Sequence, residues 1–270
     1  FYSEPDTTFY IFLAFGQSNM VGDAAPESCD YEGISSRFKM MAAVGQDGYT
    51  GTNKGPAREM YHWYTATPPL NNGYAGLSPC DYFGRTLTEK LPSHIKVGII
   101  NVAVGGCCIE HFFKEYDPAE LTRTGWPTWF QNAMHAYGDI QYIRLLDCAL
   151  RAQHDGVIKG ILIHQGESNQ NDAQWPIKVK KIYEDLLQDL HLKAEDTPLL
   201  AGEVVHADQN GKSSNANKQI DRLPQYVPTA HIIPSSGCTA NPQDRNHFNA
   251  EGYRELGRRY AQCMLQLLGY

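Results

Sequence analysis

The 270-residue sequence lacks several features that would point to particular classes of protein. Its longest apolar runs are of strand length, far below the roughly 20 residues that a membrane-spanning helix needs. Positive charge is scarce, because 23 Lys and Arg stand against 30 Asp and Glu and give a formal net charge of -7. Such a chain is a poor partner for nucleic acid or for an anionic membrane surface. A neutral or weakly charged ligand fits this composition better.

Metal-binding and redox motifs are also missing. The seven cysteines form no Cys-x-x-Cys pair, which disfavours a zinc ribbon or a thioredoxin-like site. No group of histidines has metal-ligand spacing, so we expect neither a metal nor a cofactor. The odd number of cysteines leaves at least one thiol free unless chains are cross-linked. No signal peptide is visible at Phe1, which fits either a cytoplasmic protein or a processed chain. The many Asn, Gln and Tyr residues favour a sugar-facing protein, which we expect to be secreted or periplasmic.

What is present is an alternation of apolar runs and helical periods. Continuous runs rich in β-branched residues predict strands buried on both faces at Phe9–Phe15, Lys96–Val104, Val157–Gln165, Pro198–Val205 and Ala230–Pro234. Helical periodicity lies between them, at Cys80–Leu91, Ala136–Gln153, Asp172–Leu192 and Ala250–Leu268, the last with Asn249 as a candidate N-cap. This order predicts an α/β fold, with a central parallel sheet covered by helices on both faces.

The domain organisation follows from the absence of internal breaks. We find no repeat and no sharp change in composition, so we expect one domain over residues 1–270. The stretch 24–79 is rich in Gly, Pro and Asn and is too long for a simple connection. We interpret it as a long, loop-rich insertion that can line a groove.

Polar groups follow four of the predicted strands. The segments are Gly16-Gln17-Ser18-Asn19, Gly105-Gly106, "HQGES" (His164–Ser168) and "DRNHFN" (Asp244–Asn249). The carboxyl ends of parallel strands meet at one edge of a sheet, where α/β enzymes hold their ligands. Together the four segments supply a hydroxyl, an imidazole, two carboxylates, amides and flexible backbone, the groups that acyl transfer requires.

Each of these groups has a candidate role. Ser18 can act as nucleophile, but a serine hydroxyl needs a base, and the imidazole of His247 can be that base. A carboxylate must orient the imidazole, and Asp244 and Glu167 are both candidates. The Ser18 N–H, Gly105, Gly106 and an amide donor from Gln165 or Asn19 can stabilise an oxyanion. Taken singly, Ser18 also fits a helix cap and Gly105-Gly106 a tight turn, so the hypothesis depends on their joint occurrence.

At these residues the sequence resembles the SGNH hydrolases. The matching segments are "FGQSNMVG" (Phe15–Gly22), "NVAVGG" (Asn101–Gly106), "HQGESN" (His164–Asn169) and "DRNHFNAEGY" (Asp244–Tyr253). They resemble most the branch with the sialate O-acetylesterase-like proteins and the acetylxylan esterases of carbohydrate esterase family six.

The resemblance implies a three-layer α/β/α sandwich and a serine nucleophile at Ser18 with His247 as base. It implies an oxyanion hole from Ser18, Gly105 or Gly106, and the Gln165 side chain. It makes Glu167 a partner for His247 in this branch, whereas Asp244 is the partner in the wider superfamily. The sequence does not decide between them, and we favour Glu167 as the principal acid, with Asp244 assisting. Cys107-Cys108 stands where relatives often carry Thr or Ser, which suggests apolar filler or a disulfide more than a second nucleophile.

The expected substrate is an acetylated plant polysaccharide or oligosaccharide, above all acetylated xylan. Gln17, Asn19, Trp126, Trp129 and Trp175 are candidate substrate-binding residues, with ordinary packing as the alternative for the tryptophans. Because acetyl is small, the acyl pocket is expected to be tight. The alternatives are a sialate O-acetylesterase, which the acidic composition mildly disfavours, another small-ester hydrolase, and a non-catalytic carbohydrate-binding protein. The sequence leaves the oligomeric state open.

Overall fold

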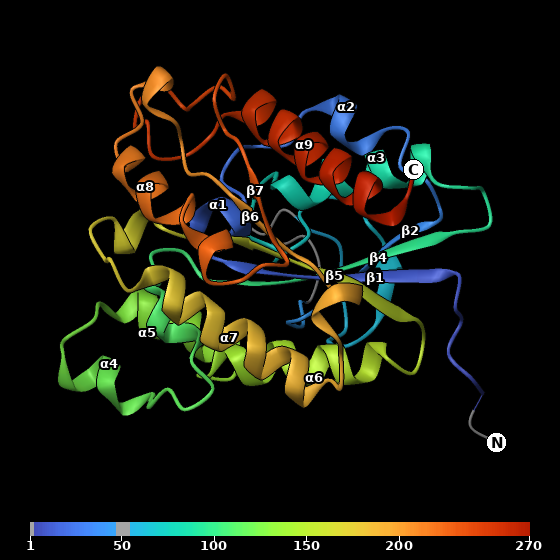
Figure 1. The fold of residues 1–270 in the computed structure, drawn as a ribbon, viewed down its shortest axis with the longest axis horizontal. Coiled ribbons are helices and arrows are strands. Elements are labelled where there is room, and N and C mark those ends of the chain that lie inside the picture. Colours follow the sequence, from blue (N-terminus) through green and yellow to red (C-terminus); the bar gives the residue numbers. More distant parts are fainter. Residues whose placement is uncertain (1–2, 47–54) are drawn as a thin grey trace.

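The computed structural model describes residues 3–46 and 55–270 and has one mixed sheet at its centre (Figure 1). The strand order is β3-β2-β4-β1-β5-β6-β7. The β2–β3 pair is antiparallel and the other neighbours are parallel. The strands are β1 (Phe9–Gly16), β2 (Phe38–Met41), β3 (Trp63–Thr65), β4 (Lys96–Ala103), β5 (Val157–His164), β6 (Leu199–Gly202) and β7 (Ala230–Ile233).

Helices cover both faces of this sheet. The α-helices are α1 (Ser18–Val21), α2 (Ser28–Tyr31), α3 (Pro79–Lys90), α4 (Ala119–Arg123), α5 (Thr128–Ala136), α6 (Gln141–Ala152), α7 (Trp175–Asp189), α8 (Asn217–Ile220) and α9 (Ala250–Leu268). Short 3-10 turns are η1 (Ile109–Phe112), η2 (Glu167–Asn169), η3 (Ala194–Asp196), η4 (Ala207–Gln209), η5 (Ser214–Ala216) and η6 (Leu223–Gln225). Helices α5, α6 and α7 lie on one face, and α3 and α9 pack together on the other (Figure 1).

The central strand β1 shows why the sheet is buried on both faces. Ile11, Leu13 and Phe15 belong to the core beneath α6 and α7, whereas Phe12 and Ala14 belong to the core beneath α3 and α9. Because successive strand residues point to opposite faces, both faces of β1 need apolar residues. The continuous apolar run therefore predicted this layer arrangement correctly, and the three-layer α/β fold is confirmed.

Two expectations differ from the structure in detail. The predicted helix Ala136–Gln153 is interrupted, because Gly138 and Asp139 have φ values of 77° and 70°. Residues in that left-handed region cannot continue a right-handed helix. The segment 24–79, expected to be loop-rich, contains β2 and β3, which extend the sheet at one edge. These strands have four and three residues, too few for a clear pattern in the sequence.

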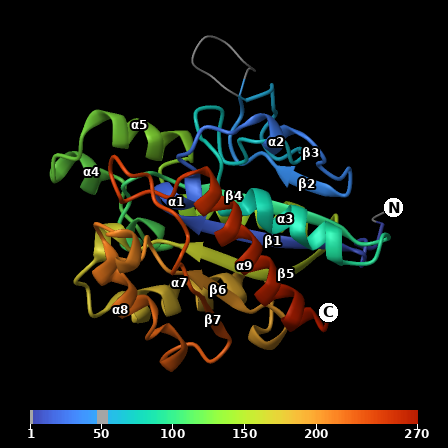
Figure 2. The ribbon, with the colours of Figure 1, turned by 90° about the horizontal axis from the view of Figure 1, so that it is seen from above.

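The carboxyl ends of the parallel strands point towards α1, α4 and α5, on the side away from both termini (Figure 2). The four polar segments all follow strands or lie in loops at this end. The cap that the sequence predicted for the last helix is present, since Asn249 Oδ1 accepts a hydrogen bond of 2.8 Å from Gly252 N. In the described ranges, no helix has both the length and the apolar character needed to cross a membrane.

Candidate active site

Ser18 is placed by the abrupt end of β1. Gly16 lies opposite His164 in the pairing of β1 with β5, and a Cβ at Gly16 would come within 2.0 Å of the His164 carbonyl oxygen. Only glycine fits this close approach. The chain then turns at Gln17, and Ser18 begins the single-turn helix α1. Its side chain is thereby held at the carboxyl edge of the sheet.

His247 reaches Ser18 from the loop that precedes α9. The His247 Nε2 atom lies 2.8 Å from Ser18 Oγ, and Nδ1 lies 2.8 Å from Asp244 Oδ2. A carboxylate accepts, so Nδ1 carries the proton and Nε2 is free to accept from the serine hydroxyl. A hydroxyl, an imidazole and a carboxylate are therefore linked in series, as serine nucleophile chemistry requires.

The Asp244 carboxylate is fixed by its own loop. Its Oδ1 accepts from the backbone N–H groups of Asn246 at 2.8 Å and His247 at 3.0 Å. Burial acts to raise the pKa of the Asp244 carboxyl, but the hydrogen bonds from the His247 ring and these N–H groups lower it below 3.8. Asp244 is therefore ionised at neutral pH, and Oδ2 is free to hold the imidazole.

Glu167 does not occupy the position that the sequence favoured for it. It has no hydrogen bond or ion pair with His247; its Oε1 accepts from Asn19 Nδ2 at 2.7 Å, and its side chain is buried. Its nearest imidazole is that of His164, with Nδ1 3.9 Å away. The choice of Glu167 as principal acid is wrong in this geometry, because Asn19 and His164, and not His247, lie beside its carboxylate.

Backbone N–H groups are available next to Ser18 Oγ. In residues 3–46 and 55–270, the N–H groups of Ser18, Gly105 and Gly106 donate to no protein acceptor. A Cβ built on Gly105 would lie 3.8 Å from Ser18 Cβ, so the two segments are adjacent. Gly106, with φ 78°, turns the chain here. Helix α1 has only four residues, so individual N–H groups matter more than a helix dipole.

Gln165 is not placed to complete an oxyanion hole. Its Nε2 donates to Gln17 Oε1 at 2.9 Å, Cys107 O at 3.2 Å and Asn169 Oδ1 at 2.7 Å. The two amide hydrogens are therefore already used inside the protein. The expected third donor is contradicted, and Gln165 instead ties together the segments that follow β1, β4 and β5.

Asn19 and Trp175 also have internal roles. Both are fully buried. Asn19 donates to Glu167 and to Asn246 O, and its Oδ1 accepts from Tyr253 Oη at 2.7 Å. Trp175 donates to Gln165 Oε1 at 2.5 Å. Neither lines the cleft, so their predicted contact with substrate is wrong.

The other substrate-binding candidates differ in whether they line the cleft. Trp126 stacks on Phe130 with ring centroids 4.4 Å apart and lies outside the cleft lining. Gln17 lines the cleft, although its side chain is held by Ser168. Trp129 lines the cleft with 61% of its surface exposed. Trp129 is therefore the predicted aromatic residue that is free to contact a ligand.

The site cleft has a volume of about 580 Å³ and contains groups that the sequence did not single out. These are Asp23, Ser168, Gln170, Lys212, Ser213 and Asn246. Asp23 Oδ2 lies 3.7 Å from His247 Nδ1, so this ring nitrogen faces two carboxylates. Asp23 lies five residues after Ser18, and that spacing past a one-turn helix is the only sequence signal for it. Ser168 and Asn246 belong to the segments HQGES and DRNHFN, whereas Gln170, Lys212 and Ser213 come from loops between β5 and α9 without a recognisable motif.

Neither a thiol nor a metal is needed to explain the site. All seven cysteines lie in the described residues and are free. Cys107 is buried, and burial raises the pKa of the Cys108 thiol to about 11, which disfavours a reactive thiolate. Asp23, Asp244 and His247 could together ligate an ion. However, His247 Nδ1 already donates to Asp244 and Nε2 already faces Ser18.

Fold and site together define an SGNH-like esterase architecture, with its polar groups at the carboxyl edge of a parallel sheet. The model of one family matches residues 8–266. The chain belongs to that family, which is described as carbohydrate esterase, sialic acid-specific acetylesterase.

Solved structures support the fold. A protein of Arabidopsis thaliana is 18% identical, with 95% of this chain and 98% of that chain covered and a TM-score of 0.71. NanS is 18% identical, with 99% of both chains covered and a TM-score of 0.67. A carbohydrate acetylesterase from Xanthomonas citri is 19% identical, with a TM-score of 0.62. That alignment covers 96% of this chain and 57% of the other.

Proposed function

We propose that the protein is a serine carbohydrate acetylesterase that acts through an acetyl-enzyme. Ser18 Oγ attacks the acetyl carbonyl while His247 Nε2 takes the hydroxyl proton. The N–H groups of Ser18 and of Gly105 or Gly106 hold the oxyanion, and Asp244 stabilises the imidazolium. His247 returns the proton to the sugar oxygen as the C–O bond breaks. Water, activated by the same imidazole, then releases acetate and restores Ser18.

The observation that carries this proposal is the Ser18–His247–Asp244 series, with both distances at 2.8 Å. A non-catalytic carbohydrate-binding protein has no need for a nucleophile, base and charged acid in hydrogen-bonding order. The series also opens onto a cleft that is large enough for sugar rings. A binding-only function is therefore the less economical explanation of the same residues.

For the substrate we propose acetylated xylan or another acetylated plant polysaccharide, handled by a secreted or periplasmic enzyme of the family-six branch. The net charge of -7 favours a neutral glycan over an anionic one. Trp129, on the rim of the cleft, offers a ring on which a sugar can stack. The carbohydrate acetylesterase from Xanthomonas citri shares this fold.

One residue favours an O-acetylated sialic acid as a second candidate. Lys212 lines the cleft and is exposed, so its ammonium group can meet the carboxylate of an acidic sugar. The description of the matching family points to the same substrate. If this candidate is right, Lys212→Gln will raise KM for acetylated sialic acid and leave hydrolysis of p-nitrophenyl acetate unchanged.

Acetate release tests the proposal directly. We would compare the wild type with Ser18→Ala on acetylated xylan, acetylated sialic acid and p-nitrophenyl acetate. We expect turnover to fall by a factor on the order of a thousand or more in the variant, because the nucleophile is lost. An unchanged thermal unfolding midpoint will show that the fold is intact. Near-full activity of Ser18→Ala would overturn the serine mechanism.

A further inference from the structure

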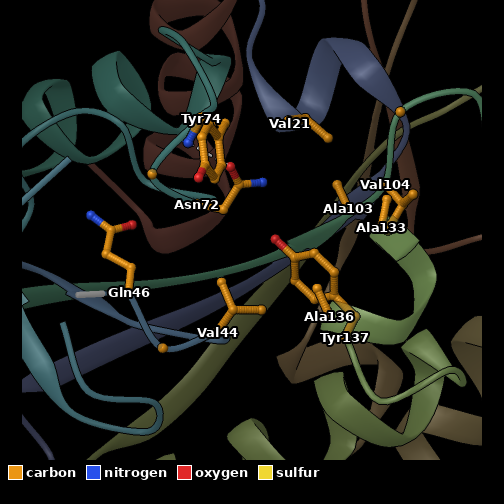
Figure 3. Close-up of a pocket in the computed structure, with 13 residues that line it drawn as sticks. Val21, Val44, Gln46, Asn72, Tyr74, Ala103, Val104, Ala133, Ala136 and Tyr137 are labelled. Carbon is orange, nitrogen blue, oxygen red and sulfur yellow. Dashed lines mark hydrogen bonds between the residues drawn. The ribbon is translucent and has the colours of Figure 1, made fainter. Parts of the chain in front are cut away.

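A second cavity borders the site cleft at Gly105. It has a volume of about 480 Å³, and Figure 3 shows its walls. Gly105 lines both this cavity and the site cleft, and its N–H is one of the candidate oxyanion donors. The cavity therefore shares a wall residue with the space in which the ester carbonyl would sit.

The walls of this cavity are mostly apolar. The apolar side chains come from α1, the end of β4, helix α5 and the segment after β2: Val21, Val44, Ala103, Val104, Ala133 and Ala136. Polar groups, from Gln46, Asn72 and Tyr74, lie across the cavity from α5 (Figure 3). A pocket with an apolar floor and a few polar groups favours an apolar ligand of limited size.

Two helices connect the cavity to the catalytic groups. Val21 follows Ser18 by three residues in α1, which places it beside the nucleophile. Helix α5 contributes Trp129 to the site cleft and Ala133 and Ala136 to the cavity. Positions four and three residues apart lie on one face of a helix. One face of α5 thus runs along both spaces.

The position of His247 decides which part of an ester each space receives. His247 must give its proton to the leaving oxygen, so the alcohol part of the ester has to lie on the His247 side. His247 lines the site cleft and does not line the second cavity. The group on the other side of the carbonyl carbon, which is the acyl chain, therefore faces the second cavity.

We infer that this cavity is an acyl pocket that accepts apolar acyl groups of about four to eight carbons, well beyond acetyl. A cavity of about 480 Å³ is far larger than one methyl group requires. Each buried CH₂ contributes about 0.8 kcal/mol, or about fourfold in affinity. The inference rests on the proposed serine esterase function and replaces the tight acyl pocket that the sequence led us to expect.

The test is a series of p-nitrophenyl esters with acetyl, butanoyl, hexanoyl and octanoyl groups. We expect kcat/KM for butanoate to exceed that for acetate by about fifteenfold, because two CH₂ groups are buried at about fourfold each. Ala133→Phe fills the cavity and should lower the hexanoate-to-acetate ratio of kcat/KM by about tenfold. Ala136→Phe, at an exposed position of the same wall, should lower it in the same direction without a risk to folding. His135→Phe, at an exposed position of α5 outside both linings and on another face of the helix, is the matched control and should keep the wild-type ratio.

Methyl hexanoate separates the acyl group from the aryl leaving group. If the cavity holds the acyl chain, Ala133→Phe will slow methyl hexanoate and p-nitrophenyl hexanoate alike. If it slows p-nitrophenyl acetate but spares methyl hexanoate, the cavity holds the aryl group and the inference is wrong. Equal rates for all chain lengths, with acetate hydrolysis still lost in Ser18→Ala, would overturn the acyl pocket alone. Acetate hydrolysis that survives Ser18→Ala would overturn the proposed function itself.

Discussion

Two carboxylate–histidine pairs lie at the carboxyl edge of the sheet, and each pair is separated by three residues in the sequence. In the pair Asp244 and His247, the carboxylate lies 2.8 Å from Nδ1, and Nε2 faces Ser18 Oγ. In the pair His164 and Glu167, the corresponding distance is 3.9 Å. His164 Nε2 instead donates to the Glu203 carbonyl at 2.9 Å. Equal spacing therefore gives one reactive pair and one internal pair.

Solvent access explains the difference between the pairs. The His247 side chain is 21% exposed, whereas the His164 side chain is completely buried. Burial lowers the pKa of the His164 imidazole, which keeps that ring neutral. His164 Nδ1 and Glu167 Oε2 have no hydrogen-bond partner in the described ranges. A base must exchange protons with substrate and water, and only His247 is placed to do so.

The difference between the two pairs is tested most directly by neutralising each carboxylate in turn. We expect Asp244→Asn to lower kcat on p-nitrophenyl acetate by about 10²- to 10⁴-fold, because the amide no longer selects the tautomer that accepts from Ser18. Glu167→Gln should cost less than about tenfold, since its oxygen can still accept from Asn19. Steady-state kinetics of both variants measure the contrast.

The control for these kinetic measurements is the thermal stability of each variant. Thermal unfolding should show Asp244→Asn within a few degrees of the wild type, so that its loss of rate is chemical. If Glu167→Gln loses as much kcat as Asp244→Asn, or more, then Glu167 is the acid that orients His247 after all. The short distance between Asp244 and His247 in the structure would then not identify the carboxylate that acts in catalysis.

The pH dependence of the unfolding free energy provides a second test, with a smaller expected effect. Burial opposes ionisation of Asp244, but its hydrogen bonds lower its pKa below 3.8 in the folded state. The contribution of these bonds to stability is therefore complete above that value and is lost as the pH falls through the folded pKa. We expect the wild type to lose more unfolding free energy than Asp244→Asn between about pH 5 and about pH 3. Urea titrations at each pH measure it, and parallel curves would contradict it.

The sequence predicted the fold more fully than the site. The five long apolar runs became β1, β4, β5, β6 and β7, because burial on both faces needs continuous apolar residues. The Ser18 and His247 segments were also found, since α/β enzymes hold their functional groups in the segments at the carboxyl ends of parallel strands. The short strands β2 and β3 were missed, because too few residues carry their pattern.

The site details that were missed depend on side-chain direction. Gln165 follows β5 as expected, yet its amide points inward to Gln17 and Asn169. Trp175 looked like a surface ring and is buried against Gln165. Glu167 and Asp244 each lie three residues from a histidine, and this spacing does not distinguish which imidazole faces the serine. The side-chain directions are determined by packing between strands that are distant in the sequence.

Asp23 offers the finest test, because it is a second carboxylate on the same ring nitrogen as Asp244. Its Oδ2 lies 3.7 Å from His247 Nδ1, beyond hydrogen-bond distance, and its side chain is 45% exposed. Exposed charge pairs contribute about 1 kcal/mol or less, so we expect Asp23→Asn to lower kcat by at most about fivefold. The loss should shrink as salt is added, because screening weakens exposed charges, whereas the loss in Asp244→Asn should not. A salt-independent loss as large as that of Asp244→Asn would mean that Asp23 orients His247 in the working enzyme.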